Sequence, residues 1–399
     1  MIRSHIPHKS TLAVLMVVDS YLPYISGVVT SVAAFARALR ADGHRVVIAA
    51  PRYPGHRDDD PDVIRLPSLP APGTPSFRLL VPLAGRLLRE RRLGTVDIVH
   101  VHGPFLAGTL GWAAARRLRS PLVFTHHTLY DQYVHYVPLL PAALTRPLAL
   151  RWARAFANRC DLVIAPSEVI RARLRALRIT APIEVLPTGG IDPEQLGRCD
   201  VVEVRARYGI PPESPLLVSV SRLAPEKSVD VVLRAFQQVG EPWGAYLLIV
   251  GDGPSAGDLR RLAGDLGITG RVRFTGALPH AAALAAMAAG DLFVFASQTE
   301  THGVVLVEAM AVGLPVVAVA RAGAAEVVRD GEAGMLVEPA PEALAAAVRR
   351  LLAEPARRAA MSRRAREIAA GYAVPTLARR LAALYRSARA QADRSPQRT

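Results

Sequence analysis

Short apolar runs alternate with helical segments along most of the 399-residue chain. This alternation is typical of βαβ units, in which buried parallel strands are joined by crossover helices. In the first half, a helix is predicted across the stretch that ends at Gly43, because its apolar positions recur every three or four residues. Strands are predicted at Leu12–Val18, Val46–Ala50, Ile98–His102, Leu122–Thr125 and Leu162–Ala165, with a further edge strand at Ile183–Leu186.

The second half repeats this pattern after a connection at Asp192–Pro215 that mixes proline, glycine and charge. The sequence therefore predicts an α/β protein of two Rossmann-like domains, 1–198 and 199–375, each with a doubly wound parallel sheet, facing an inter-domain cleft. An amphipathic helix at 376–392 is expected to pack back on the first domain. In the second half, strands are predicted at Leu216–Val220, Tyr246–Val250, Val272–Thr275, Leu292–Phe295 and Val316–Val319, and helices at Asp230–Val239 and Leu259–Leu266.

Composition narrows the class of protein. Hydrophobic residues make up 51% of the chain and charged residues 21%, which indicates a well-buried globular protein. The formal net charge is +15, yet of the 49 basic residues only Lys9 and Lys227 are lysines and the other 47 are arginines. The excess charge reflects either a general compositional habit or an anionic partner such as a membrane surface. Aromatic residues are only 6% and are not interleaved with basic ones, which argues against a nucleic-acid binder.

The cysteines and the apolar runs bear on location. Cys160 and Cys199 form neither a disulfide framework nor a metal-ligand spacing, so a reducing, cytoplasmic setting is expected. The first apolar run ends at Asp19 without a small-residue cleavage site and is interpreted as a strand, not a signal sequence. No run approaches the roughly 20 apolar residues of a spanning helix, so any membrane contact is expected to be peripheral.

The most informative segment for chemistry is Ser297–Val319. It follows a predicted strand, breaks at Thr299–Gly303 and becomes helical near Val304. A helix that opens directly after a strand offers unpaired N–H groups to a phosphate. Glu300 and Glu308 flank this point and suit a sugar and a ribose; the alternative is that one caps the helix and the other is solvated.

Two cations follow the strand Leu216–Val220. Arg222 and Lys227 lie five residues apart before the next helix, and Lys227 stands out in a chain that otherwise uses arginine. Such a pair neutralises a diphosphate leaving group through charge-assisted hydrogen bonds, without a metal. The alternative is an exposed pair on a surface loop.

Other sequence motifs are each weaker evidence for a binding site when taken alone. Gly251 opens a glycine-rich turn after a strand, and Gly27 precedes a helix, but both positions also suit ordinary tight turns. His126 and His127 end a strand and could donate to a sugar hydroxyl. Asp58–Asp60 contains a D-x-D pattern, but no strand precedes it, so it is interpreted as solvated acid and not as a metal site.

Taken together, these segments resemble the retaining glycosyltransferases of family 4, also called group 1, which have the two-domain GT-B architecture. The resemblance spans nearly the whole chain and is strongest over 215–319, where Glu300 and Glu308 match the E-x7-E spacing and Arg222 and Lys227 match the S-R-L-x-x-E-K pattern. It departs at Ser26–Gly27, where many members have two glycines, and at His302.

The resemblance implies roles for individual residues. Arg222 and Lys227 would hold the donor diphosphate, with Gly27 and the amides of Val304 and Val305. Gly251 and Gly303 complete the donor-binding set. Glu308 would bind the ribose, and Glu300 would contact the transferred hexose. His127, which directly precedes Thr128, would lie at the hexose 6-hydroxyl. The resemblance implies no cofactor and no metal.

Within the family, two stretches, THHTLYDQYVHYVP and VLPTGGID, resemble the branch that glycosylates diacylglycerol or phosphatidylinositol. A lipid acceptor at the inner face of the cell membrane is the corresponding expectation, with a glycan or soluble acceptor as the alternative. The stretches FRLLVPLAGRLLRERR and PLALRWARAFANR carry arginines among helically spaced apolar residues, as interfacial helices do, although core-facing helices with arginine rims have the same pattern.

Other enzyme classes remain to be separated from this interpretation. A nucleotide-sugar epimerase shares the two-domain shape and the donor. A dinucleotide-dependent oxidoreductase is disfavoured, because no G-x-G-x-x-G follows the first strand. The nucleobase, the hexose, the acceptor, the linkage and the oligomeric state are not encoded in any motif of the sequence.

Overall fold

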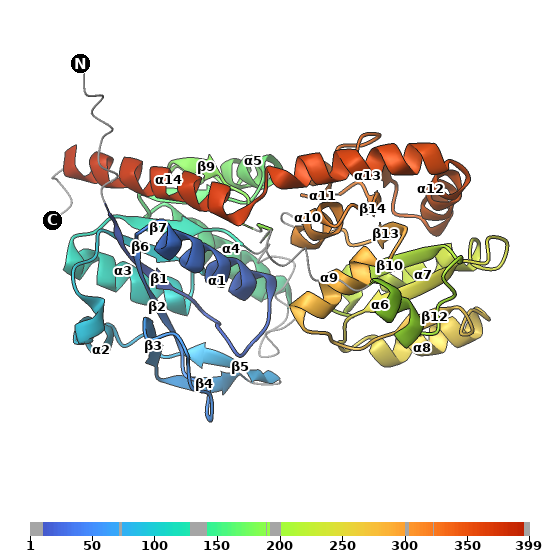
Figure 1. Cartoon of the computed structure of the whole chain (residues 1–399). Coiled ribbons are helices and arrows are strands. Elements are labelled where there is room, and N and C mark those ends of the chain that lie inside the picture. The colour runs from blue at the N-terminus through green and yellow to red at the C-terminus, as the bar shows by residue number, and fades with distance from the viewer. Residues whose placement is uncertain are drawn as a thin grey trace, which may run out of the picture. The chain divides into compact units, whose positions relative to one another are not determined.

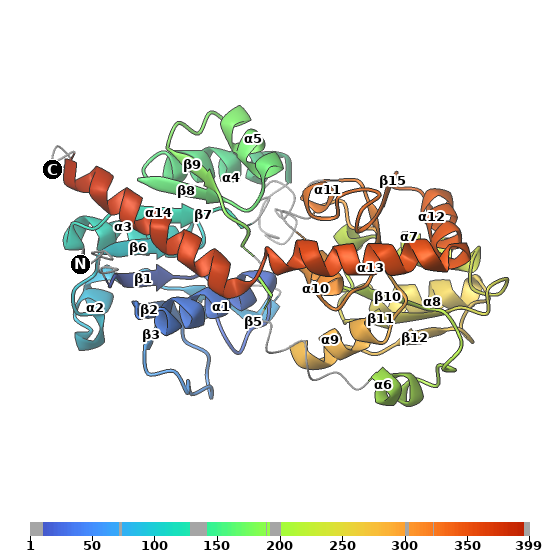
Figure 2. The same cartoon turned by 45° about the horizontal axis from the view of Figure 1, so that its top comes forward.

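A computed structural model describes residues 11–71, 74–127, 142–188, 190–191, 201–299, 303–321 and 323–394. The chain divides into two compact units. Unit 1 comprises the chain up to Pro166 together with Arg171–Leu186 and the segment from Pro375 onward. Unit 2 comprises Ser167–Ile170 and Pro187–Val374 (Figures 1 and 2).

Unit 1 is built on a seven-stranded parallel sheet in the order β3-β2-β1-β6-β7-β8-β9, beside a small antiparallel β4-β5 hairpin. Its strands are β1 (Ala13–Val17), β2 (Arg45–Pro51), β3 (Val63–Leu66), β4 (Ser68–Ala71), β5 (Thr74–Leu80), β6 (Ile98–Val101), β7 (Leu122–Thr125), β8 (Leu162–Ala165) and β9 (Ile183–Val185). Its helices are α1 (Gly27–Ala41), α2 (Ala84–Leu88), the short 3-10 turn η1 (Arg91–Leu93), α3 (Leu106–Leu118), α4 (Ala142–Ala157), α5 (Glu168–Ala176) and α14 (Val374–Arg394).

Helices cover both faces of this sheet. Alternate residues of β1, such as Val14 and Met16, pack in one core with α1 and α14, while α3 packs on the other side against β6, β1 and β7. The last helix, α14, therefore contributes to unit 1 although it follows unit 2 in the chain; both views show it lying along that unit (Figures 1 and 2). Its Tyr385 is fully buried, and its hydroxyl lies 2.7 Å from Nδ1 of His100 in β6.

Unit 2 contains a six-stranded parallel sheet in the order β12-β11-β10-β13-β14-β15. Its strands are β10 (Leu216–Val220), β11 (Tyr246–Val250), β12 (Val272–Phe274), β13 (Leu292–Phe295), β14 (Val316–Val319) and β15 (Gly334–Val337). Its helical elements are α6 (Val201–Arg207), the 3-10 turn η4 (Pro225–Lys227), α7 (Val229–Gln237), α8 (Ala256–Asp265), α9 (His280–Ala288), α10 (Val304–Ala311), α11 (Ala324–Val327), α12 (Pro341–Ala353) and α13 (Pro355–Ala370).

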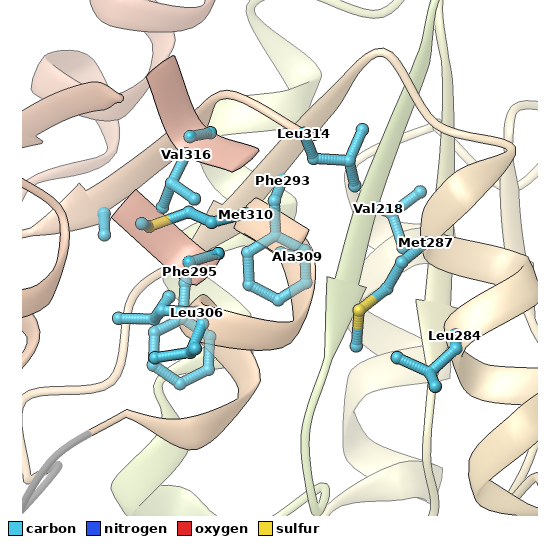
Figure 3. Close-up of a cluster of buried hydrophobic side chains, with 14 of the residues drawn as sticks. Val218, Leu284, Met287, Phe293, Phe295, Leu306, Ala309, Met310, Leu314 and Val316 are labelled. Atoms are coloured by element: carbon cyan, nitrogen blue, oxygen red, sulfur yellow. The ribbon is translucent and has the colours of Figure 1, made fainter. Parts of the chain in front are cut away.

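Side-chain alternation along each central strand gives unit 2 two cores. On one face, Val218, Phe293 and Val316 pack against residues of α9, α10 and α13; Figure 3 shows Met287, Met310 and their neighbours in this cluster. On the other face, the intervening strand residues pack against α7, α8 and α12. Strands buried on both faces account for the nearly continuous apolar runs in the sequence, so the prediction of two doubly wound parallel α/β domains is confirmed.

The structure corrects parts of the sequence interpretation. All predicted strands are present, within two residues of the expected ends, but β3, β4, β5 and β15 were missed. In β15, a side chain on Gly334 would lie 2.0 Å from the carbonyl oxygen of Val316, so a residue that suggests a turn is required by close strand packing. The stretch FRLLVPLAGRLLRERR, whose spacing predicted a helix of either the interfacial or the core-facing kind, begins in β5 and is helical only at α2 and η1. The expected linker contains α6, while 192–200 lie outside the described residues.

The Tyr385–His100 hydrogen bond leads to a test of how α14 is held. Replacing Tyr385 by Phe leaves Nδ1 of His100 buried without its partner, so the free energy of unfolding is expected to fall by about 1–3 kcal/mol. Chemical denaturation measures the change. Ser387→Ala removes an exposed hydroxyl from the same helix and is expected to have no effect. Equal stability of the two variants would show that the buried hydrogen bond does not hold α14.

Candidate functional site

The central strands of unit 2 bring three loops together at one edge of the sheet. β10 is paired with β11 on one side and with β13 on the other. The strand order therefore runs outward from β10 in both directions, which makes this place a switch point. Ligands of doubly wound sheets bind at such a switch point, outside the carboxyl ends of the strands. Arg222 and Lys227 follow β10, Gly251 follows β11, and Gly303 precedes α10 after β13.

Backbone hydrogen bonds fix the loop that carries Arg222. The amide of Ser221 donates to Val250 at 3.1 Å, and the amide of Leu223 donates to Asp252 at 3.0 Å. Gly251 permits this approach, because it has a φ of +133° and a side chain there would lie 1.9 Å from the Ser221 carbonyl oxygen. The backbone conformation and the close approach of Ser221 therefore require glycine at position 251. This agrees with the alternative, left open by the sequence, that Gly251 forms an ordinary tight turn.

The turn that carries Lys227 is joined to the loop after β13. Lys227 closes η4, where its amide donates to Ala224 at 3.0 Å, and Ser228 follows in the left-handed region with a φ of 49°. The hydroxyl of Ser297 donates to the Glu226 carbonyl at 3.4 Å. The Lys227 turn, which follows the Arg222 loop, and the start of the loop after β13 are therefore adjacent at the switch point.

Helix α10 begins where the sequence predicted. Gly303 is its N-cap residue with a φ of 72°, and the amide of Leu306 donates to Gly303 at 2.9 Å. The amides of Val304 and Val305 belong to the first turn, and neither has a hydrogen-bond partner within the part of the chain that the structure describes. Glu300 and His302 lie outside the described residues.

Glu308 lies one turn inside α10 and is not a solvated helix carboxylate. Its side chain is only 13% exposed, and Oε1 lies 2.7 Å from Nε2 of His280, the first residue of α9. Sequence reasoning missed His280, because a contact across 28 residues between two helices leaves no local pattern. The carboxylate is held by an imidazole in a fixed place.

Unit 1 has a switch point of the same kind, between β1 and β6. Gly27 opens α1 after β1, and a side chain built there would meet no described atom within 4 Å. Packing therefore does not require glycine at this position. The hydroxyl of Ser26 caps the helix by accepting from the Val29 amide at 3.3 Å.

Three buried histidines line the strand ends next to this switch point. Nε2 of His127 lies 2.9 Å from Nδ1 of His102, and the His102 ring packs on His100 with centroids 4.1 Å apart. Burial lowers the pKa of His127 to about 3, with a smaller contribution from His126, so the imidazole is neutral. His127 can thus exchange hydrogen bonds with a ligand, but it carries no charge. The sequence does carry a pattern that indicates the partners of His127: His100 and His102 lie two residues apart in an otherwise apolar segment.

Asp19 was also missed by the sequence analysis. It follows β1, and its Oδ1 accepts from the Ala107 amide at the start of α3 at 2.8 Å. Burial raises the pKa of this carboxyl to about 6, against the lowering effect of that hydrogen bond. Gly103 makes room for it, since a side chain there would lie 1.9 Å from Oδ2 of Asp19.

The acidic run at Asp58–Asp60 is less solvated than the sequence suggested. Asp60 pairs with Arg40 at 2.6 Å, and Asp58 pairs with Arg65 and with His56. Asp58 and Asp60 therefore form ion pairs within unit 1. Within the described ranges, no group of three or more His, Cys, Asp or Glu side chains is arranged to hold a metal ion.

Comparisons with known proteins agree with this geometry. Residues 200–368 match the family "Glycosyl transferases group 1", and residues 25–195 match "Glycosyltransferase Family 4". The alpha-monoglucosyldiacylglycerol synthase of Streptococcus pneumoniae is 33% identical over 75% of this chain and 69% of its own length. A GDP-mannose-dependent alpha-mannosyltransferase of Mycolicibacterium smegmatis is 32% identical over 88% of this chain and 92% of its own.

Solved structures share the fold. Sucrose-phosphate synthase from Thermosynechococcus elongatus superposes with a TM-score of 0.78 at 25% identity, over 96% of this chain and all of the other. Anabaena HepE in complex with UDP-glucose superposes with a TM-score of 0.74 at 23% identity, over 94% of this chain and all of the other. The two-sheet arrangement is that of the GT-B architecture.

The close approach at Gly251 can be tested by substitution. In Gly251→Ala, the new methyl group collides with the Ser221 carbonyl at a φ that L residues avoid, so the free energy of unfolding is expected to fall by about 1–3 kcal/mol. Gly257→Ala, in α8 with open space around it, is the matched control and is expected to be neutral or stabilising. Denaturant titration of both variants measures this. A Gly251→Ala variant as stable as Gly257→Ala would contradict the described loop contact.

Proposed function

Because the chain belongs to the family 4, or group 1, glycosyltransferases and is therefore a hexosyltransferase, we propose that it moves a hexose from a nucleotide diphosphate sugar to a membrane glycolipid precursor, with retention of configuration. Diacylglycerol or a phosphatidylinositol lipid is the proposed class of acceptor. The donor diphosphate is assigned to unit 2 and the acceptor to unit 1.

The observation that carries the donor assignment is the hydrogen bond that joins the Lys227 turn to the loop after β13 at the unit 2 switch point. Arg222 and Lys227 follow one strand, and the first-turn amides of Val304 and Val305 open a helix after the neighbouring strand. Two cations and two amide donors suit a pyrophosphate, whose oxygens accept several hydrogen bonds and whose charge is favoured at a helix N-terminus. The Ser297–Glu226 hydrogen bond supports a single binding surface.

The remaining donor contacts follow from the resemblance and the local geometry. Glu308, held by His280, is assigned to the ribose hydroxyls, for which a partly buried carboxylate is a suitable acceptor. Glu300 is assigned to the transferred hexose. Gly27, where packing leaves room, is assigned to close backbone approach to the diphosphate, and the neutral His127 to the hexose 6-hydroxyl.

In the proposed reaction, the acceptor oxygen bonds to the anomeric carbon as the bond from that carbon to the diphosphate oxygen breaks. The acceptor proton passes to a phosphate oxygen on the same face. The charge that develops on the leaving diphosphate is stabilised by Arg222, Lys227 and the helix amides, so the protein supplies positioning and electrostatic stabilisation without a metal or cofactor.

A lipid acceptor is supported by unit 1. Leu148 and Trp152 of α4 are 63% and 47% exposed. Around α2 and η1, four arginines line a surface cavity of about 600 Å³ with a single acid, Glu90: Arg86, Arg89, Arg91 and Arg92. Exposed apolar side chains and clustered arginines suit an anionic lipid surface. Among the described residues, no helix combines the length and apolarity that crossing a bilayer requires.

Because anionic lipids are concentrated in the cytoplasmic leaflet, the proposed location is the cytoplasm, at the inner face of the cell membrane. The relatives support this acceptor class, since three of them are named for diacylglycerol or phosphatidylinositol lipids. A second candidate is a soluble acceptor, because a D-inositol 3-phosphate glycosyltransferase of Nocardia farcinica is 33% identical over 65% of this chain.

Substitution of the two cations tests the donor site. Lys227→Ala and Arg222→Ala should each lower kcat by about 10²- to 10³-fold, because loss of one preorganised charge contact costs about 2.7–4 kcal/mol in the transition state. Transfer of labelled hexose from a panel of nucleotide sugars measures the rate. Arg234→Ala, which removes an exposed arginine from the neighbouring helix α7, should retain the wild-type rate. Wild-type turnover in either cation variant would remove that residue from the site.

Vesicle binding tests the acceptor class. The protein should co-sediment with phosphatidylglycerol vesicles at low salt and be released at high salt, while phosphatidylcholine vesicles bind it weakly. The double variant Arg86→Gln and Arg89→Gln should bind less than Arg349→Gln with Arg363→Gln, which removes the same charge from unit 2. If vesicles are not bound and only soluble acceptors are glycosylated, the second candidate replaces the first.

A further inference from the structure

Three of the buried histidines of unit 1, His100, His102 and His127, belong to two hydrogen-bonded groups. His100 uses both ring nitrogens, since Nδ1 lies 2.7 Å from the Tyr385 hydroxyl and Nε2 lies 2.7 Å from the Thr125 hydroxyl. His102 uses one, since Nδ1 lies 2.9 Å from Nε2 of His127. The His102 and His127 rings are nearly parallel, with centroids 5.1 Å apart. His102 is thus fixed between the His100 ring and His127.

The two nitrogens left over in the His102–His127 pair differ in their surroundings. Nε2 of His102 is enclosed and has no hydrogen-bond partner among the described residues. Nδ1 of His127 belongs to the last residue before the undescribed stretch 128–141, and no hydrogen bond joins it to a described residue. The proposed function assigns His127 to the sugar donor, so Nδ1 of His127 is the nitrogen left to contact it.

Both rings are neutral, because burial lowers the pKa of His102 well below its usual value and that of His127 to about 3. The charged groups and titratable rings that face them are His100 and His126, whose charges would lower these pKa values further. A neutral imidazole carries one proton, so one ring must donate and the other accept in the hydrogen bond between them.

The enclosed nitrogen decides which ring donates. If His127 donated, the proton of His102 would sit on Nε2 as a buried N–H without a partner. If His102 donates from Nδ1, its Nε2 keeps only a lone pair. A buried N–H without a partner is rarer and more costly than an unused acceptor. The proton therefore belongs on Nδ1 of His102, Nε2 of His127 accepts, and the proton of His127 lies on Nδ1.

We propose that His102 is a positioning residue that holds His127 as the Nδ1–H tautomer, so that His127 offers a ligand oxygen an N–H donor and not a lone pair. The consequence for the reaction rests on the proposed function: His127 donates to a hydroxyl or phosphate oxygen of the sugar donor and does not act as a base toward the acceptor. The tautomer itself is a property of the protein without substrate.

Nitrogen-15 NMR of histidine-labelled protein tests the tautomer directly. The ring of His127, assigned by the loss of its signals in His127→Gln, should show a protonated Nδ1 and an unprotonated Nε2 near neutral pH. A protonated Nε2 would overturn the proposal. This measurement needs no turnover, so it decides the tautomer even if the chain transfers no sugar, and failure of the proposed function stays distinguishable.

Variants at His102 test the positioning role. His102→Asn keeps an amide donor near the place of Nδ1 and should retain most of the activity. His102→Leu removes the donor and should lower kcat about 10- to 100-fold, the usual effect of losing a group that orients a functional side chain, with the KM for the nucleotide sugar nearly unchanged. His102→Gln, whose amide lies one carbon further out, should resemble His102→Leu and replaces it if that variant does not fold.

The pattern among the three variants separates positioning from packing. A packing role predicts losses that follow thermal stability, whereas positioning predicts rescue by Asn alone. Wild-type kcat in His102→Leu, or an equal loss in Asn and Gln, would refute the role of His102.

Discussion

Parallel pairing at the two switch points is the constraint on which the rest of the structure depends. In unit 1, β1 lies between β2 and β6, and in unit 2, β10 lies between β11 and β13. The helices that follow the two neighbouring connections pack on opposite faces of the sheet. The crossover helices that the structure describes lie on the faces of the two sheets. Loops therefore lie at the strand ends, and Arg222, Lys227 and His127 follow strands there.

The two units build their sites with different electrostatics. In unit 2, the cations Arg222 and Lys227 and the opening turn of α10 provide a positive surface suited to a diphosphate. In unit 1, the strand ends carry neutral, buried imidazoles and a carboxyl whose pKa burial raises to about 6. The cations of unit 2 thus contrast with the neutral imidazoles at the strand ends of unit 1, whose hydrogen bonds join uncharged rings and hydroxyls.

Packing also links the chain ends to the chemistry. Tyr385 of α14 is hydrogen-bonded to His100, and the His102 ring packs against the His100 ring at a tilt of 41°. A helix that follows the whole of unit 2 in sequence thereby supports the strand ends of unit 1. Glu308 is fixed in a comparable way by His280, which comes from the preceding helix.

The sequence by itself determined the α/β class, the two-sheet organisation and most of the strands, because strands buried on both faces must be apolar. It also located the start of α10, because the glycine before Val304 marks the N-terminus of that helix. It also pointed to Arg222, Lys227 and Glu308 through spacing within single segments. It could not reveal the His102–His127 and Glu308–His280 pairs, the role of Asp19, or the strands β3 and β15. Those features depend on contacts between segments far apart in the chain, and only the tertiary structure fixes which side chains meet, which atoms lose water and where a proton must reside.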